Sequence, residues 1–324
     1  MNDQQQLLTD MVDGLFAGLG PSATMEAHWA QIEELALTSL LLTEDEGGFG
    51  GSWQDALIVF RLSGYHALAL PVAEAVIAAR LAAGTGHEGR GTIASRTDGA
   101  INGSRFSGTL YGAAMSEGVA FIAAPDNDGG TIIVATGDGR RTAVLNPAGE
   151  GRDVWHFAAA PTLRVARNVF AYGAFVRLAQ IAGGLDSALA MSVSYVNDRQ
   201  QFGRPLSKFQ AVQQSLATFA CEAAAANCAA MGAAQALDLG SADYEIAAAK
   251  LRANRAAGVG ASLAHQAHGA IGFTKEYSLH PFTRRLLSAR SEFGGDSYWA
   301  AVLGGRVAQA GADRFWSDLT ALTD

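Results

Sequence analysis

The sequence is poor in cysteine, in basic residues and in long apolar runs. Only two of its 324 residues are cysteine, so a disulfide framework is not expected. Lys and Arg number 23 against 31 Asp and Glu, and the net charge of −8 argues against nucleic-acid binding over a broad surface. Polar residues interrupt the Ala-rich segments, so no membrane insertion is expected. The first residues carry no basic run typical of a secretory signal. These absences predict a cytoplasmic protein.

The two cysteines, Cys221 and Cys228, lie seven residues apart in an Ala-rich stretch with a helical pattern. Seven residues make about two helical turns, so both side chains fall on one face of the helix. No further metal ligands surround them in the sequence, and no metal site is expected. We therefore expect the two cysteines to be small, buried packing residues.

The sequence divides into three successive segments, with helical, β and again helical patterns. Residues 1–83 repeat apolar side chains at intervals of three and four, as helices do. Residues 84–161 alternate short β-prone runs with turns rich in glycine and aspartate, such as DGAINGS and PDNDGG. Residues 162–324 return to a helical pattern rich in alanine, which allows close helix packing. We predict a mostly α fold: an N-terminal helical domain, a small central β-sheet or barrel-like domain, and a C-terminal helical bundle.

The stretch YVNDRQQFGRPLSKFQAVQ, residues 195–213, joins two predicted helices. Gly203 and Pro205 end the first helix and leave free backbone amides beside Arg199. An arginine beside free amides suits an anion such as a pyrophosphate. An ordinary helix junction, in which the arginine only pairs with an acid, has the same pattern. These residues alone do not decide between the two interpretations.

This stretch resembles the flavin-binding signature of acyl-CoA dehydrogenases. The resemblance implies that Arg199, Phe202 and Gly203 contact FAD. It also implies that Gln210 reaches the cofactor across a subunit interface. Looser similarity to the N-terminal helical and middle β domains of shorter bacterial members extends over most of the chain.

A second segment, QAHGAIGFTKEYSLHPFTRR, is similar to the family segment whose backbone contacts the FAD of the neighbouring subunit. Read without the family, it is also consistent with a helix end capped by Gly269. Ala270 stands where the family more usually has glycine. The residues that the resemblance places against the cofactor are Gln266, Ala267, His268, Gly269 and Ala270.

The resemblance implies an FAD-dependent acyl-CoA dehydrogenase of β-oxidation, acting on fatty acids or steroid side chains. Such an enzyme introduces an α,β double bond into an acyl-CoA thioester, and the electrons pass to an electron-transfer flavoprotein. The flavin accepts the hydride. A protein carboxylate in an apolar pocket removes the α-proton, because burial raises its pKa towards the working pH.

Neither usual position of that carboxylate holds an acid in this sequence. One is a Glu–Gly pair after the paired arginines, where this chain has Phe293 and Gly294. The other falls at about Gly173, within residues 168–184, which contain no acid. The nearest candidates, Glu292 and Asp296, are displaced by one and three residues. A shift of one residue turns a helical side chain by about 100°.

Three hypotheses follow. In the first, Glu292 or Asp296 is a displaced base, and the chain is a complete enzyme that forms a homo-oligomer. In the second, the chain lacks the base and completes the FAD site of a paralogous catalytic chain in a heterotetramer. Its length resembles that of the short subunits of heteromeric dehydrogenases in bacterial steroid and side-chain catabolism. In the third, the chain is a non-catalytic scaffold of the same fold.

Overall fold

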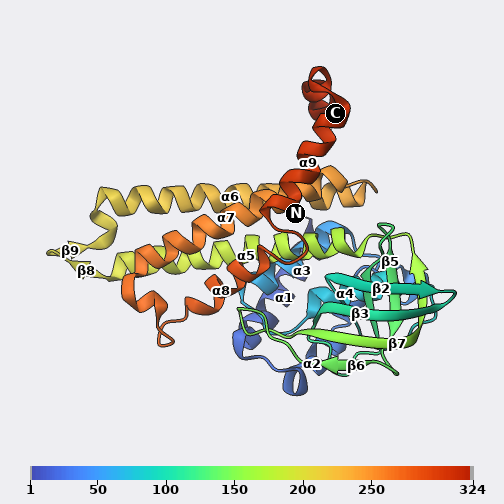
Figure 1. Ribbon diagram of the computed structural model, residues 1–324. Coiled ribbons are helices and arrows are strands. Elements are labelled where there is room, and N and C mark those ends of the chain that lie inside the picture. The colour runs from blue at the N-terminus through green and yellow to red at the C-terminus, as the bar shows by residue number, and fades with distance from the viewer. Residues whose placement is uncertain (1, 322–324) are drawn as a thin grey trace.

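Figure 1 shows the computed structural model, which describes residues 2–321. A curled β-sheet lies between two helical parts in the chain order and packs at one side of them in space. The predicted order of helical, β and helical parts is confirmed. Local signals fix the helix starts, as at Ser52, whose side chain and backbone form a reciprocal capping box with Asp55. The N-terminal helices are α1 (Asp3–Leu19), α2 (Met25–Glu34), α3 (Trp53–Tyr65) and α4 (Val72–Ala82).

The sheet has seven strands in the order β1-β4-β5-β7-β3-β2, and β6 also pairs with β7. Only the β1–β4 pair is parallel among the described strands, and the remaining pairs are antiparallel. The long strand β7 pairs with β3, β5 and β6 and so holds the sheet together. The strands are β1 (Gly91–Ile93), β2 (Arg96–Asn102), β3 (Arg105–Ala114), β4 (Phe121–Pro125), β5 (Thr131–Ala135), β6 (Arg140–Thr142) and β7 (Arg152–Val165).

Two expectations for the β part are corrected. The segment DGAINGS was predicted as a turn, but most of it belongs to strand β2, and the turn begins at Gly103. Because β2 is an edge strand with mostly exposed side chains, it lacks the apolar run that marks a buried strand. The predicted boundary at residue 161 falls inside β7, which continues to Val165. Pro161 is exposed there, a setting in which a strand tolerates its missing N–H donor.

Helix α5 is the central element of the bundle and also contacts the N-terminal helices. It packs against α3, α6, α7 and α8. The bundle projects away from the sheet, and α9 and α10 extend from the body (Figure 1). Its elements are α5 (Val169–Asp198), a hairpin of β8 (Gln200–Gln201) and β9 (Arg204–Pro205), α6 (Gln210–Asp238), α7 (Asp243–His268), α8 (His280–Ala289), α9 (Asp296–Ala310) and α10 (Phe315–Thr320).

The expectation for the two cysteines was wrong, because Cys221 and Cys228 are both exposed on α6. The buried face of this helix carries alanines instead, including Ala223, Ala226 and Ala230. The spacing of seven correctly places both thiols on one face. In a helix so rich in alanine, however, the apolar pattern does not show which face is buried.

Helix α6 is also the one helix among residues 2–321 whose length and apolar character would suffice for a membrane span. That criterion is weak, since core helices of soluble proteins meet it as well. In this protein α6 packs against α5 and α7 along its buried face.

Helices α3 and α5 approach each other closely through Gly64 and Gly183. A Cβ atom on Gly183 would overlap the carbonyl oxygen of Arg61, and one on Gly64 would overlap that of Gln180. Both obstacles are backbone atoms, which cannot rotate away. Glycine at these two positions therefore sets the distance between the N-terminal helices and the bundle.

We expect Gly183→Ala to lower the free energy of unfolding by about 1–3 kcal/mol, because the added methyl overpacks the α3–α5 contact. Gly232 on α6 is the matched control, because a Cβ there would meet no atom within 4 Å. Gly232→Ala should instead gain up to about 1 kcal/mol from helix propensity. Urea unfolding of both variants measures the difference, and equal effects would contradict the close-packing argument.

Candidate functional site

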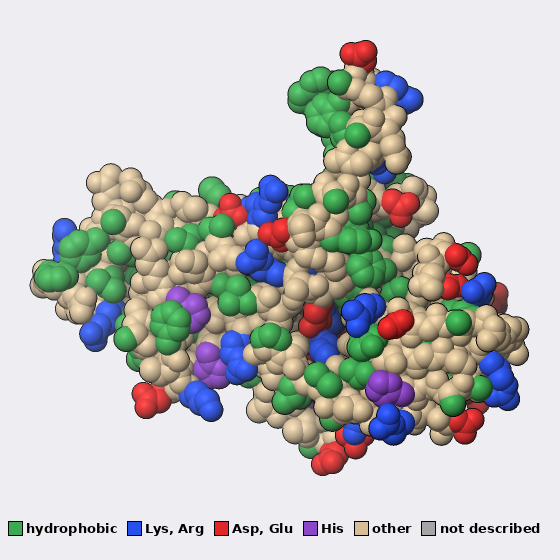
Figure 2. All heavy atoms as spheres, viewed as in Figure 1, with side chains coloured by type: hydrophobic (Ala, Val, Ile, Leu, Met, Phe, Trp, Pro, Cys, Tyr) green, Lys and Arg blue, Asp and Glu red, His purple; other side chains and the backbone are tan. Residues whose placement is uncertain are grey.

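The residues of the first motif lie at the end of the bundle remote from the sheet (Figure 1). Arg199 ends α5, and Phe202 and Gly203 form the turn of the β8–β9 hairpin with φ angles of 52° and 77°. Phe202 is 90% exposed, and Gln210, at the start of α6, is also exposed. Figure 2 shows hydrophobic and basic side chains together at this left-hand tip. The structure thus presents all four predicted residues on one projecting surface.

The second motif ends α7 at the same end of the bundle. The ring of His268 stacks on Tyr195 of α5 with centroids 4.6 Å apart, which brings the two motifs side by side. His268 is buried, its Nδ1 donates to the carbonyl oxygen of Ala264 at 2.8 Å, and burial lowers its pKa. Of the other predicted residues, Ala267 is half-buried and Gln266, Gly269 and Ala270 are exposed.

This exposed tip suits a cofactor that is bound mainly by another chain. Gly203 and Gly269 both have positive φ angles and open space where a Cβ would lie, so a ligand can approach their backbone. Arg199 forms no ion pair within residues 2–321 and is available to an anion. An unpaired arginine beside accessible amides fits the pyrophosphate of FAD.

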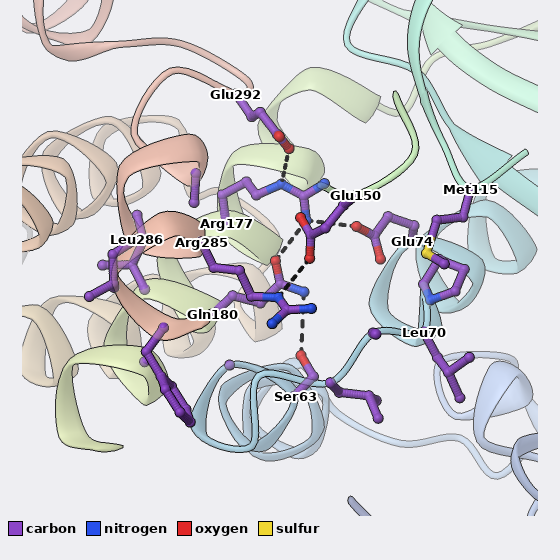
Figure 3. A pocket seen from close by; sticks show the side chains of 18 of the residues that line it. Ser63, Leu70, Glu74, Met115, Glu150, Arg177, Gln180, Arg285, Leu286 and Glu292 are labelled. Carbon is purple, nitrogen blue, oxygen red and sulfur yellow. Dashed lines mark hydrogen bonds and ion pairs between the residues drawn. The ribbon is translucent and has the colours of Figure 1, made fainter. Parts of the chain in front are cut away.

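A second candidate region is a cavity of about 40 Å³ where α3, α4, α5 and α8 meet residues 150–152, at the start of β7 (Figure 3). Such a volume holds a few water molecules, whereas pockets for cofactors and drug-sized ligands measure roughly 300–1,000 Å³. Three acids and three arginines line the cavity: Glu74, Glu150, Glu292, Arg152, Arg177 and Arg285.

Arg177 lies at the centre of these charges and is 1% exposed. Its Nη1 donates to Glu74 Oε1 at 2.7 Å, and its Nε donates to Glu292 Oε2 at 2.6 Å. The same Nη1 also donates to Gln180 Oε1 at 2.7 Å. Burial alone would lower the pKa of Arg177, but Glu292 and Glu74 raise it above the ordinary value. The guanidinium is therefore permanently charged and ties α4, α5 and the turn after α8 together.

Glu292 was predicted as a displaced base, and its surroundings do not suit that role. Arg152 Nε donates to both of its carboxylate oxygens at 3.0 Å, and Asn146 Nδ2 donates to Oε1 at 2.9 Å. Burial raises the pKa of Glu292, but Arg152 and Arg177 outweigh that effect and lower it to about 2. A carboxylate with so low a pKa is a weak base near neutral pH.

Asp296, the other predicted base, begins α9 and bonds to Arg290 Nη2 at 3.0 Å. Its side chain is 38% exposed. It is not among the described residues that line the cavity. The geometry therefore gives each displaced acid a cationic partner and leaves neither free inside the cavity.

The two positions at which the resemblance would place the base, Gly173 and Phe293, lie against each other. The ring of Phe293 occupies the space that a Cβ on Gly173 would need, and Phe293 is 3% exposed. Phe293 and Gly294 have φ angles of 52° and 96° and form a tight turn. The phenyl ring at one of these positions therefore fills the space beside the other, and neither position carries a carboxylate.

The sequence interpretation did not single out Glu74 or Arg177, although a signal was present. Each is an isolated charge in an otherwise apolar helical run, Glu74 in α4 and Arg177 in the first half of α5. Charged residues are almost never fully buried unless paired, so isolated charges at core positions indicate a buried ion pair. The identity of the partner was not visible, because 103 residues separate the two.

The sequence and the fold are both similar to those of known proteins. Residues 163–306 match the model of the acyl-CoA dehydrogenase C-terminal domain. Acyl-CoA dehydrogenase IpdE2 of Mycobacterium tuberculosis is 25% identical over 310 residues, which cover 87% of this chain and 91% of that protein. Glutaryl-CoA dehydrogenase of Desulfococcus multivorans is 37% identical over 124 residues, 37% of this chain and 32% of that protein. The ChsE4-ChsE5 complex from Mycobacterium tuberculosis contains a chain of similar fold, with a TM-score of 0.82 and 21% identity over 96% of this chain and 99% of that chain.

Arg177→Met should lower the free energy of unfolding at neutral pH by about 3–5 kcal/mol, because it removes the cationic partner of the buried Glu74 and leaves Glu292 with Arg152 alone. Arg61→Met is the matched control. Its ion pair with Asp186 is partly exposed, and its loss should cost about 1 kcal/mol or less. Chemical denaturation compares the two, and a loss for Arg177→Met no larger than the control's would contradict the central role of Arg177.

The contribution of Glu292 should depend on pH with a definite sign. Its pKa in the folded protein, about 2, lies below the ordinary value of 4.5. The stabilisation is therefore complete above pH 4.5 and is lost as the pH falls towards 2. Between these limits the wild type should lose stability more steeply than Glu292→Gln. Parallel curves in acid titrations of unfolding would show that Glu292 titrates normally.

Proposed function

We propose that this chain is a member of the acyl-CoA dehydrogenase family and a subunit of an FAD-dependent acyl-CoA dehydrogenase, on the basis of the C-terminal-domain match at residues 163–306, the similarity to IpdE2 and the shared fold. The assembly introduces an α,β double bond into an acyl-CoA thioester in the cytoplasm and passes electrons to an electron-transfer flavoprotein. Within it, this chain is the base-lacking partner that completes the FAD site of a paralogous catalytic chain.

The small volume and the charged lining of the cavity beside Arg177 carry this proposal. An acyl thioester beside a flavin ring needs a pocket of several hundred Å³, and the cavity measures about 40 Å³. Arg177 and its two carboxylates occupy the space that would have to be apolar. Phe293 and Gly173 offer no carboxylate to remove a proton. Nothing in this geometry supports dehydrogenation inside the cavity of this chain.

The exposed tip of the bundle supports the proposal that this chain completes the FAD site of its partner. When FAD is bound, its flavin supplies the hydride acceptor. The residues of this chain would hold the cofactor from outside: Arg199 would pair with the pyrophosphate, the backbone at Gly203 and Gly269 is open to it, and the exposed Gln210 in the first turn of α6 would contact it. These groups lie at the end of the bundle remote from the sheet, so they stay available although charge fills the cavity.

A partner chain follows from this separation of the two regions. A subunit with a cofactor-contacting tip, and with charge filling the cavity beside Arg177, needs a second, unlike chain that supplies both the acyl pocket and the base. The chain of similar fold in the ChsE4-ChsE5 complex, an assembly of two named proteins, supports such a partner. We assign the assembly a heterotetrameric form with one FAD for every two unlike chains.

The test is to co-express this chain with the adjacent reading frame and to measure the mass and FAD content of the purified assembly. We expect one FAD per two unlike chains, and no FAD on this chain alone. Arg199→Ala should weaken FAD retention by about tenfold or more, the effect of losing one charge-assisted hydrogen bond. Lys208→Ala is the matched control, since Lys208 is a basic and exposed residue at the same tip.

Three results would contradict the proposal in different ways. One FAD per chain and turnover of acyl-CoA by this chain alone would establish a complete enzyme. Loss of turnover in folded Glu292→Gln or Asp296→Asn assemblies would support the hypothesis that one of these acids is a displaced base. A colourless assembly would favour the non-catalytic scaffold.

A further inference from the structure

Lys250 of α7 is a fully buried cation beneath the turn that follows α8. Its Nζ donates to Asn254 Oδ1 at 2.6 Å, to the carbonyl oxygen of Ala289 at 3.0 Å and to that of Gly294 at 3.2 Å. An ammonium group has three N–H donors, and these three acceptors use all of them. All three acceptors are neutral, and no carboxylate within residues 2–321 forms an ion pair with Lys250.

The turn held by Lys250, residues 290–295, forms part of the cavity wall through Glu292. It carries Glu292, which bonds to Arg177, and Phe293, which packs against Gly173. Ala289 is the last residue of α8 and Gly294 lies near the far end of the turn, so Lys250 ties both sides of it. Positive φ at a bulky residue such as Phe293 is strained and persists only where surrounding contacts impose it.

We propose that Lys250 is a proton-dependent clamp on this turn, and therefore a positioning residue for Glu292 in the cavity wall and for Phe293 against Gly173. When the ammonium loses its proton to solvent, the amine keeps two donors and gains a lone pair. A lone pair cannot bond to a carbonyl oxygen, so one of the three acceptors loses its donor. Gly294, at the longest of the three distances, retains a second donor in Asn254 Nδ2 at 3.3 Å. Deprotonation thus loosens the turn without freeing it.

The groups around Lys250 make this proton labile near neutral pH. Burial has the largest effect and lowers the pKa of Lys250 to about 7. Arg177 from α5 and Arg290 from the turn act in the same direction, whereas Glu292 from the turn and Asp296 from α9 oppose them. Asn254, the side chain facing Lys250 from its own helix, carries no charge.

The pH dependence of two quantities, the free energy of unfolding and the mobility of the turn, distinguishes a clamp from a residue that only stabilises the whole protein. Unfolded Lys250 keeps the ordinary pKa of 10.5, so the unfolded state binds more protons than the folded state between pH 7 and 10.5. The free energy of unfolding therefore rises with pH across this window. Over the same window the turn loses a hydrogen bond, so local mobility and overall stability increase together. A residue that served only overall stability would not have this combined effect.

Trp299 is a natural reporter of the clamp. Its indole Nε1 donates to the carbonyl oxygen of Phe293 at 3.1 Å, and the ring is buried beside Gly294. The experiment follows tryptophan fluorescence of the full chain from pH 5.5 to 9 and subtracts the signal of Trp299→Phe. We expect one transition with a midpoint within about a unit of 7, and its loss in Lys250→Met.

Asn254→Ala keeps the test decisive if Lys250→Met does not fold. Removal of the shortest acceptor favours the neutral amine, so the midpoint should move to lower pH. The clamp proposal is wrong if the wild type shows no Trp299 transition between pH 6 and 8, or if Lys250→Met still shows that transition. An unmoved midpoint in Asn254→Ala would also overturn it. The measurement needs neither FAD nor a partner chain, so its outcome is independent of the proposed function.

Discussion

A buried arginine between two carboxylates determines the shape of the region where a catalytic pocket would be expected. Arg177 of α5 joins Glu74 of α4 to Glu292 of the turn after α8. Removal of each of these charges from water costs several kcal/mol, and only the complete set of bonds compensates for it. The walls that carry Glu74 and Arg177 cannot move apart without leaving a charge unpaired in the interior. The interaction that holds these helices together therefore also fills the cavity with charge.

The β domain adds a second layer to the same network. Arg152, at the start of β7, bonds to Glu292, and Glu150 pairs with both Arg152 and Arg285. Each acid in this layer thus faces more than one cation, which keeps the pKa values of Glu150 and Glu292 low although both are largely removed from solvent. The tip of the bundle shows the opposite arrangement, with an unpaired arginine, two open glycines and an exposed phenyl ring. The protein therefore combines a charge-filled cavity with an exposed surface that is open to a ligand.

The sequence predicted those features that depend on short-range patterns. Helical periodicity and turn residues gave the order of the three parts, and contiguous motifs located the tip at Arg199 and Gly203. Strand β2 was missed because an edge strand needs no apolar run, and the buried face of α6 was missed because alanine occurs on both faces. The partners of Glu292 were beyond such reasoning, since Arg177 and Arg152 lie 115 and 140 residues away. The sequence alone showed that residues 173 and 293 are not acids. The ion pairs that occupy the cavity could be identified only from the fold.

The exposed face of α6 has a consequence for redox chemistry. Cys221 and Cys228 project from one side of the helix, two turns apart, which separates their Cα atoms by about 10 Å. A disulfide requires Cα atoms within about 7 Å, so the two thiols cannot join each other while the helix is intact. Oxidation can link them only to thiols outside the chain, so an oxidised sample will contain mixed disulfides or covalent dimers, whereas a reduced one will not.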